Sequence, residues 1–189
     1  MPKRRVLFLL AMIFCVVAAN RLANVSGSDW PPIKPEELKM TGVPEAPGGP
    51  AVILYRQVNR EDKLFGSKEH VYVRIKVLTE DGRKYGDVEI PSLQGRYDIS
   101  SVRGRTVHID GTVIPFNGKV YDRTILKSKG FSYLAKMLVM PDVQVGSAIE
   151  YEYYIDYQDR YFYQEEWVLS DALFTREAKF SFTPYWKRP

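Results

Sequence analysis

The chain has 189 residues, of which 45% are hydrophobic and 26% charged, and its net charge is +4 at neutral pH. Residues 1–19 hold three of the 27 basic residues and none of the 23 acidic ones, so the rest of the chain carries only +1. This near balance, without a Lys/Arg run after residue 19, excludes the basic surface of a nucleic-acid-binding protein. Cys15 is the only cysteine, so the chain after residue 19 can form neither a disulfide nor a cysteine nucleophile.

The first nineteen residues have the three parts of a secretory signal peptide. Three basic residues precede an apolar run over residues 6–17, and Val17-Ala18-Ala19 supplies small residues for cleavage. The run is too short for an ordinary membrane span. The sequence therefore predicts a signal peptide at residues 1–19 and an extracytoplasmic protein, periplasmic or secreted, that begins near Asn20. No stable membrane span is expected after signal removal.

Residues 20–50 are predicted to form a Pro/Gly-rich tether. Six of the twelve prolines lie between Trp30 and Ala51. Proline fixes φ and lacks a backbone donor, so this stretch can hold neither a central strand nor a long helix. Only a short helical turn, at residues 36–40, is expected within it.

From residue 51 the dominant hydrophobic period is two, which is typical of half-buried antiparallel strands. The dipeptides Asp81-Gly82 and Asp110-Gly111 favour hairpin turns. Residues 133–140 fit either a short helix or a strand. Seven or more short strands with tight turns predict an all-β fold, an antiparallel β-sandwich with little helix, over residues 51–185. The expected strands are 52–58, 71–77, 84–90, 101–109, 112–116, 148–157, 161–169 and 177–183, and residues 186–189 form a tail.

Alternation also predicts which side chains face the core. In the strand over 148–157, Ile149 and the tyrosines two and four positions later share the inner face, which leaves Glu150 and Glu152 in solvent. The predicted core consists of Val73, Ile75, Ile149, Tyr151, Phe180 and Phe182.

Two stretches carry a resemblance to a known family. Residues 97–116 form a strand, the turn Val107-His108-Ile109-Asp110-Gly111-Thr112 and a returning strand, and residues 140–151 lead through a Pro turn and a Gly turn into a Tyr-rich strand. In this order, behind a signal peptide, they resemble the bacterial domain of unknown function 3857. The resemblance covers about residues 51–185. It implies a β-sandwich at the N-terminus of secreted proteins, ahead of a transglutaminase-like catalytic domain, whose Cys/His/Asp set we expect to be absent from this chain.

The residues offer little for catalysis or metal binding. His70 and His108 are the only histidines, and neither lies near a Gly-x-Ser-x-Gly elbow or has metal-ligand spacing. We therefore expect no enzyme, no catalytic residue, no metal site and no cofactor.

Paired carboxylates leave an alternative open. Residues two apart on a strand lie about 6.5 Å apart, within the separation of about 5 to 9 Å used by glycosidases. Glu150 or Glu152, with Glu165 or Glu166 from the next expected strand, would make a glycosidase-like enzyme. A solvated strand face accounts for the glutamates of 148–157 without chemistry.

Aromatic residues are the remaining candidates for a binding surface. Eight of them lie within residues 151–167, and such rings can stack on sugars or pair across strands. Tyr154 is expected on the polar face and is the surface candidate. Trp167, Phe174, Tyr185 and Trp186 are expected to form an interaction surface, with completion of the core as the alternative.

These observations favour a non-catalytic extracytoplasmic module that acts as an accessory or interaction domain. Its expected partner is a transglutaminase-like catalytic domain or another envelope protein. A carbohydrate-binding module of the envelope that uses the Tyr-rich strands, and the glycosidase-like enzyme, remain the alternatives.

Overall fold

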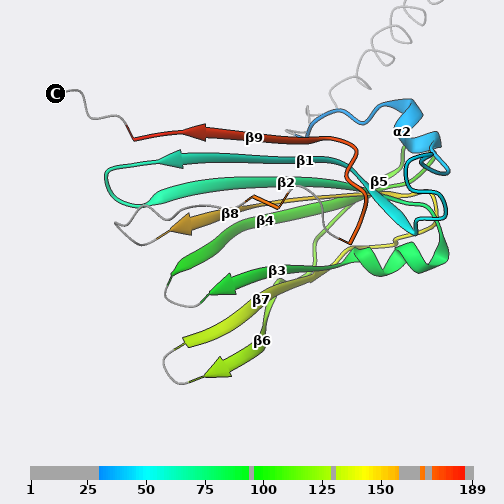
Figure 1. Ribbon diagram of the computed structural model, residues 1–189. Coiled ribbons are helices and arrows are strands. Elements are labelled where there is room, and N and C mark those ends of the chain that lie inside the picture. Colours follow the sequence, from blue (N-terminus) through cyan, green and yellow to red (C-terminus); the bar gives the residue numbers. More distant parts are fainter. Residues whose placement is uncertain (1–29, 94–95, 129–130, 158–166, 169–171, 186–189) are drawn as a thin grey trace, which may run out of the picture. The chain divides into compact units, whose positions relative to one another are not determined.

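The computed structural model describes residues 30–93, 96–128, 131–157, 167–168 and 172–185. The chain divides into two compact units, Met1–Ile33 and Lys34–Pro189, and the fold is that of the second unit. Two β-sheets form this unit (Figure 1). The larger sheet has the order β5-β4-β8-β2-β1-β9 and the smaller one the order β3-β7-β6. The larger sheet is built from β1 (Ala51–Asp62), β2 (Ser67–Val77), β4 (Tyr97–Val107), β5 (Val113–Pro115), β8 (Ala148–Tyr157) and β9 (Ala178–Thr183), and the smaller one from β3 (Asp87–Leu93), β6 (Tyr121–Ser128) and β7 (Phe131–Val139).

One hydrophobic core joins the two sheets. Alternate residues of β2 and β8 point into it, as the period of two predicts, and Val88 and Ile90 of β3 and Leu138 of β7 meet them. The rings of Tyr151 and Tyr153 stack with centroids 6.4 Å apart and pack against the same core. The prediction of an all-β sandwich with mainly antiparallel strands is confirmed. The buried core residues include Val73, Ile75 and Ile149 from the larger sheet and Val88, Ile90 and Leu138 from the smaller one.

The predicted hairpin at Asp81-Gly82 is wrong. Residues Glu80–Gly86 form a 3₁₀ helix, η1, and the strand that follows, β3, pairs with β7 in the other sheet. The reason is that β1 and β8 already occupy both edges of β2, so a returning strand has no edge to pair with. Gly82 is instead pressed against Pro50, whose carbonyl oxygen would lie 2.0 Å from a Cβ at this position.

The second predicted hairpin is confirmed. Strands β4 and β5 pair antiparallel around Asp110-Gly111. Gly111 has a φ of +88°, a conformation that an L side chain rarely adopts, and the Asp110 side chain accepts a hydrogen bond from the Thr112 amide at 2.9 Å.

Two other strand assignments needed the structure. Residues 133–140, which fitted a helix or a strand, lie almost entirely in β7. Strand β9 is an edge strand of the larger sheet and pairs in parallel with β1. Phe182, near the C-terminal end of β9, is 51% exposed, so the prediction that Phe182 lies in the core is wrong. Phe180 packs against the core as a partly buried side chain. Of the expected strand at 161–169, only Trp167 and Val168 lie within the described residues.

Residues 34–50 pack onto the larger sheet on the side away from the smaller one. The short helix α2 (Pro35–Lys39) lies here, and Lys76 of β2 donates hydrogen bonds to the carbonyls of Leu38, at 2.5 Å, and of Gly146. A second apolar cluster consists of Val43, Val52 and Leu54, with Met40, Leu78 and Phe174 against it. The second half of the expected tether is thus part of the folded unit.

Candidate functional site

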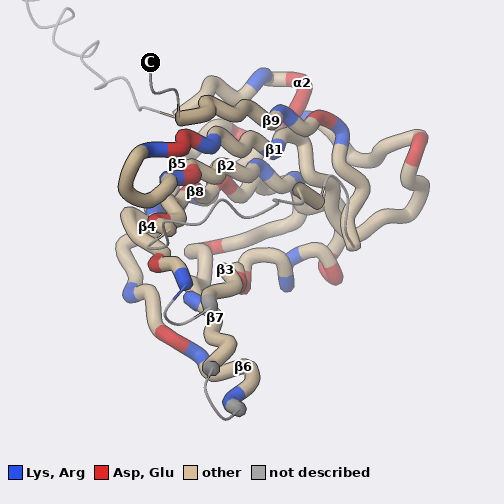
Figure 2. Tube along the Cα trace, turned by 60° about the vertical axis from the view of Figure 1, so that its left-hand side comes forward, with Lys and Arg blue, Asp and Glu red and all other residues tan. Residues whose placement is uncertain are grey.

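A polar face covers β2, β8 and β4 on the side of the larger sheet opposite the core. Strand pairing places its residues in rows that run across β2, β8 and β4. Figure 2 shows acidic and basic positions close together on β1, β2 and β8. We call this the polar face, and its four central rows are Arg74–Glu150–Arg105, Tyr72–Glu152–Arg103, His70–Tyr154–Ser100 and Lys68–Asp156–Asp98.

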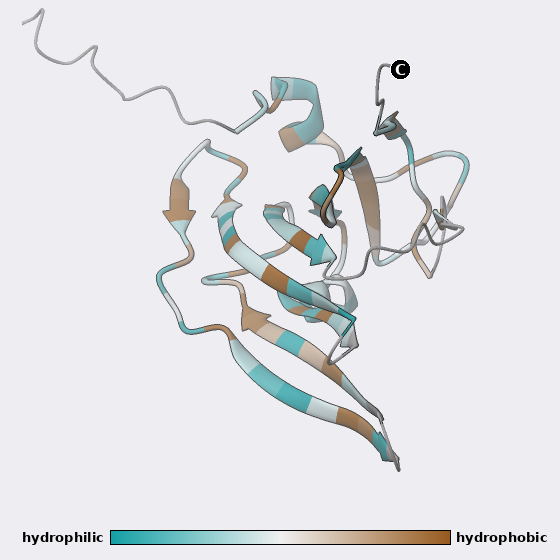
Figure 3. Cartoon of the chain, turned by 90° about the vertical axis from the view of Figure 1, so that its left-hand side faces the viewer, coloured by the Kyte–Doolittle hydropathy of each residue, from teal (hydrophilic) through white to brown (hydrophobic). Residues whose placement is uncertain are grey.

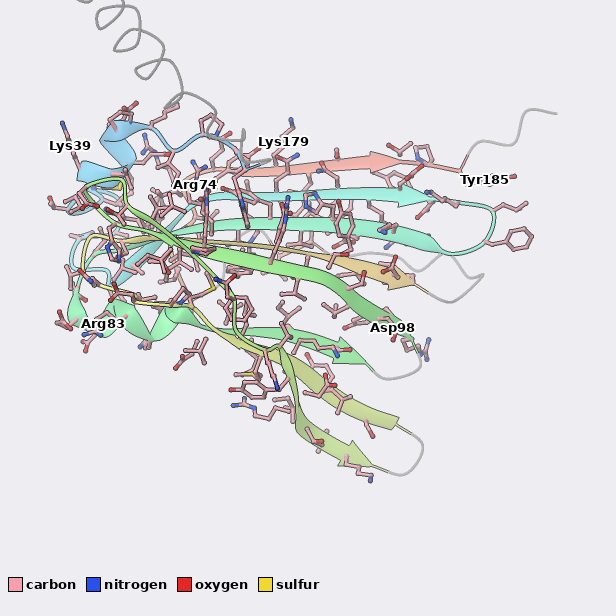
Figure 4. The ribbon with its side chains drawn as sticks, turned by 180° about the vertical axis from the view of Figure 1, so that it is seen from behind. Lys39, Arg74, Arg83, Asp98, Lys179 and Tyr185 are labelled. Atoms are coloured by element: carbon pink, nitrogen blue, oxygen red, sulfur yellow. The ribbon has the colours of Figure 1, made fainter. Side chains whose placement is uncertain are left out.

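The first row contains a fully buried carboxylate. Glu150 has no exposed surface, and its oxygens lie 2.9 Å from Arg74 Nη2 and 2.5 Å from Arg105 Nε. The Tyr72 hydroxyl donates to the same carboxylate, and burial together with Glu150 raises the pKa of Tyr72 far above its ordinary value. Arg74 also pairs with Glu37 of α2 at 2.9 Å, on the side of the sheet seen in Figure 4. The row is therefore a closed ion-pair network that lies beneath α2.

The side chains of the next rows are more exposed to solvent than those of the first row. Glu152 pairs with Arg103 and lies 3.2 Å from Nε2 of His70. The His70 ring stacks on the Tyr154 ring at 4.7 Å, and the Lys68 ammonium lies 4.5 Å from the centre of the same ring. Tyr154 is thus on the polar face, as predicted, and partly exposed, but neighbouring side chains already contact its ring.

The prediction that Glu150 and Glu152 face solvent is wrong, since they are 0% and 5% exposed. Alternation places them correctly on the face opposite the core but does not reveal what covers that face. In the structure α2 and the arginines of β2 and β4 cover it. Both carboxylates are engaged by guanidinium groups, and Glu165 and Glu166 lie outside the described residues.

The other predicted surface residues are dispersed. Trp167 stacks on Phe180 at 5.3 Å and packs against the main core, and Phe174 packs against the second apolar cluster. Tyr185 is half-buried, at the end of the larger sheet opposite α2 (Figure 4). Trp186 lies outside the described residues. The described members of this set do not form one surface.

The apolar side chains that are exposed lie elsewhere. Leu64 and Phe65, in the turn between β1 and β2, are 56% and 71% exposed, and Phe182 of the neighbouring strand β9 lies toward the same end of the sheet. We call Leu64, Phe65 and Phe182 the turn surface. The sequence signal for it is an apolar pair directly before Gly66 in a turn, where polar residues are usual. A second stretch, Ile125-Leu126, is exposed on β6, the outer strand of the smaller sheet (Figure 3).

Within the described part of the chain, no group of three or more His, Cys, Asp or Glu side chains is arranged to hold a metal ion. The same residues include no helix that is both long and apolar enough to cross a membrane.

A search of curated proteins found no match. A solved structure described as a putative protease from Parabacteroides distasonis ATCC 8503 aligns over 57% of this chain and 23% of its own, with 12% identity and a TM-score of 0.52, which shows a shared fold. Yeast LTA4 hydrolase in complex with Bestatin aligns over 66% of this chain and 19% of its own, with 12% identity and a TM-score of 0.29.

This chain spans less than a quarter of the length of either structure. Residues 66–183, well over half of the chain, match the family described as a domain of unknown function with a solved structure, DUF3857. The chain therefore belongs to the DUF3857 family.

Proposed function

We propose that this chain is a non-catalytic extracytoplasmic module that docks against a catalytic domain of the transglutaminase-like kind. The observation that carries the proposal is the recurrence of this fold as 23% of a much longer chain described as a putative protease. A fold that forms a minor part of such a protein is suited to hold or present the part that does the chemistry.

The state of the acidic residues supports a non-catalytic role. A glycosidase needs two carboxyl groups that reach the substrate from opposite sides of the scissile bond. Glu150 has no exposed surface and Glu152 almost none, and arginines bind both. The carbohydrate-binding alternative needs a free aromatic face, whereas the Tyr154 ring is contacted by His70 and Lys68.

The turn surface is the part of the molecule that best suits docking. Its three apolar side chains are each more than half exposed at one end of the sheet, and exposed apolar surface of this kind marks interaction sites. Tyr185 lies at the same end of the sheet (Figure 4). We therefore assign the docking role to this end of the larger sheet and not to Trp167 or Phe174.

Calorimetric titration of the full chain with a transglutaminase-like protein from the same organism tests the proposal. The variant Phe65→Ser should weaken association by about tenfold or more, because truncation of an apolar anchor residue removes about 2 kcal/mol. Ile125→Ser, an exposed apolar residue of β6, is the matched control and should leave affinity unchanged. Equal affinities for both variants, or no association, would contradict the proposal.

Two further measurements separate the alternatives. Saturable binding of an envelope glycan that is lost in Tyr154→Ala would favour the carbohydrate-binding module. Glycosidase turnover by the isolated chain that is lost in Glu152→Gln would favour the enzyme.

We further propose that residues 1–19 direct export and are removed, which leaves Asn20 as the first residue. Intact-mass measurement of the exported protein tests this. A product that retains Met1 and stays in the membrane fraction would show that the segment is an anchor instead.

A further inference from the structure

A cavity of about 250 Å³ opens between the two sheets beside β3, the edge strand of the smaller sheet. Its apolar walls come from both sheets and from the segment before β9, and they are Ile53, Ile75, Val88 and Leu173. All four are buried core residues. The volume is below the range of about 300–1,000 Å³ typical of drug-sized ligands, so a ligand about the size of one amino acid fits best.

Arg56 brings a positive charge into this apolar surrounding. It lies on the core side of β1, in the same row as Val73 of β2 and Tyr151 of β8. Its Nη1 donates to the carbonyl of Val168 at 3.0 Å, and within the described residues no carboxylate forms an ion pair with it. A guanidinium group binds an anion best as a carboxylate or phosphate.

Tyr151 supplies a second donor at the same wall. Burial raises the pKa of Tyr151 to about 12, with Arg56 acting in the opposite direction, so its hydroxyl is protonated at neutral pH. Arg56 and Tyr151 together form a small cluster of donors on one wall of a cavity that is otherwise lined by aliphatic side chains.

The opposite wall is the open edge of β3. The Gly86 carbonyl accepts from the Met140 amide at 2.8 Å, and the pairing of Asp87 with Val139 follows. In an antiparallel ladder the inward and outward residues alternate, so the backbone groups of Asp87 and Glu89 point away from β7. Pro91 belongs to the same outward set, where its missing N–H has no cost. Glu89 therefore offers a backbone donor and acceptor that a peptide group can pair with.

The donors on the β1 side set the orientation of a ligand. Val88 and Ile90 face the core, so the side chains of Asp87 and Glu89 lie on the opposite face of β3, where Arg123 pairs with Glu89 at 2.6 Å. A ligand carboxylate is thus attracted to Arg56 on the β1 side, whereas the β3 side presents backbone groups. A ligand N–H is favoured beside the outward backbone carbonyl of Glu89.

From this arrangement we propose that the cavity binds an apolar residue with a free α-carboxylate, as a free amino acid or as the C-terminal residue of a peptide. Its carboxylate lies against Arg56 and Tyr151, its side chain fills the space between the sheets, and its amide or ammonium group faces β3. This site is separate from the turn surface, so its test does not depend on the docking proposal.

NMR titration of the ¹⁵N-labelled full chain with N-acetyl-leucine tests the site. Saturable shifts should appear at the amides of Glu89 and Leu173. Arg56→Gln should weaken the binding by about tenfold, because a charge-assisted hydrogen bond is lost. Lys179→Gln, which removes a positive charge from the opposite face of the adjacent strand, is the control and should leave affinity unchanged. Tyr151→Phe, which retains the ring, should weaken binding severalfold. It replaces Arg56→Gln as the test variant if Arg56→Gln does not fold.

Three probes separate the sources of the ligand. N-acetyl-leucinamide lacks the carboxylate and should bind at least about tenfold more weakly. Tighter binding of free leucine than of N-acetyl-leucine identifies an amino acid, and the reverse order identifies a peptide end. Absence of saturable shifts, or equal affinity of the wild-type chain and of a folded Arg56→Gln variant, would overturn the proposal.

Discussion

The buried ion-pair row predicts a large loss of stability when its carboxylate is made neutral. Glu150→Gln keeps the size of the side chain and removes one negative charge that serves Arg74 and Arg105. Glu37 remains to pair with Arg74 at 2.9 Å, whereas Arg105 loses the carboxylate that lies 2.5 Å from its Nε. Removal of one partner from a buried ion pair costs about 3–5 kcal/mol, and the amide that remains should place the cost near the lower limit, about 3 kcal/mol.

Urea unfolding at pH 7 measures this loss. With a slope of about 2 kcal/mol per molar urea, a loss of about 3 kcal/mol lowers the midpoint by about 1.5 M. Glu89→Gln is the matched control, because Glu89 forms a comparably close pair with Arg123 on the surface, at 2.6 Å. Exposed pairs contribute about 0–1 kcal/mol, so this variant should unfold close to the wild-type midpoint.

A double-variant cycle tests the assigned cause. If the cost of Glu150→Gln comes from unpaired guanidinium charge, adding Arg105→Met should cost less in the Glu150→Gln variant than in the wild type. A cost of less than about 1 kcal/mol for Glu150→Gln, or strictly additive effects, would refute a closed ion-pair row beneath α2.

Three further outcomes follow from the fold. Burial lowers the pKa of Lys76 from 10.5 to about 8, so between these values the unfolded chain binds a proton that the folded chain lacks. Stability should therefore rise by about 2 kcal/mol from pH 7 to 9.5 in urea unfolding, and Lys76→Met should abolish that rise. Phe180→Ala should destabilise by about 2–3 kcal/mol and Phe182→Ala by less than about 1 kcal/mol in the same assay, and equal effects would contradict their different burial. Gly82→Ala should lower the melting temperature measured by calorimetry, because its Cβ would lie 2.0 Å from the Pro50 carbonyl oxygen, and an unchanged value would show that η1 can shift.

The sequence by itself determined those strands and turns that depend on neighbouring residues. The strand over 148–157 coincides with β8 as Ala148–Tyr157, and Asp110-Gly111 forms the expected hairpin, because side-chain alternation and turn chemistry act over a few neighbouring residues. The resemblance over residues 97–116 and 140–151 also pointed to the correct family.

Tertiary structure alone decided what each face contacts. The period of two places Glu150 and Ile149 on opposite faces, but it cannot show that α2 and two arginines cover the polar side. For this reason Glu150, which the sequence predicts in solvent, is fully buried in the structure. It also cannot show which edges of a strand are free, and for this reason Asp81-Gly82 leads into η1 instead of a hairpin.

The cavity beside β3 has the same origin. In the sequence, the cavity is indicated only by the charge of Arg56, two residues before the buried Val58. Its apolar walls come from β1, β2, β3 and residue 173. Contacts between segments so far apart in the chain depend on how the two sheets pack, and periodicity within one strand carries no information about that packing.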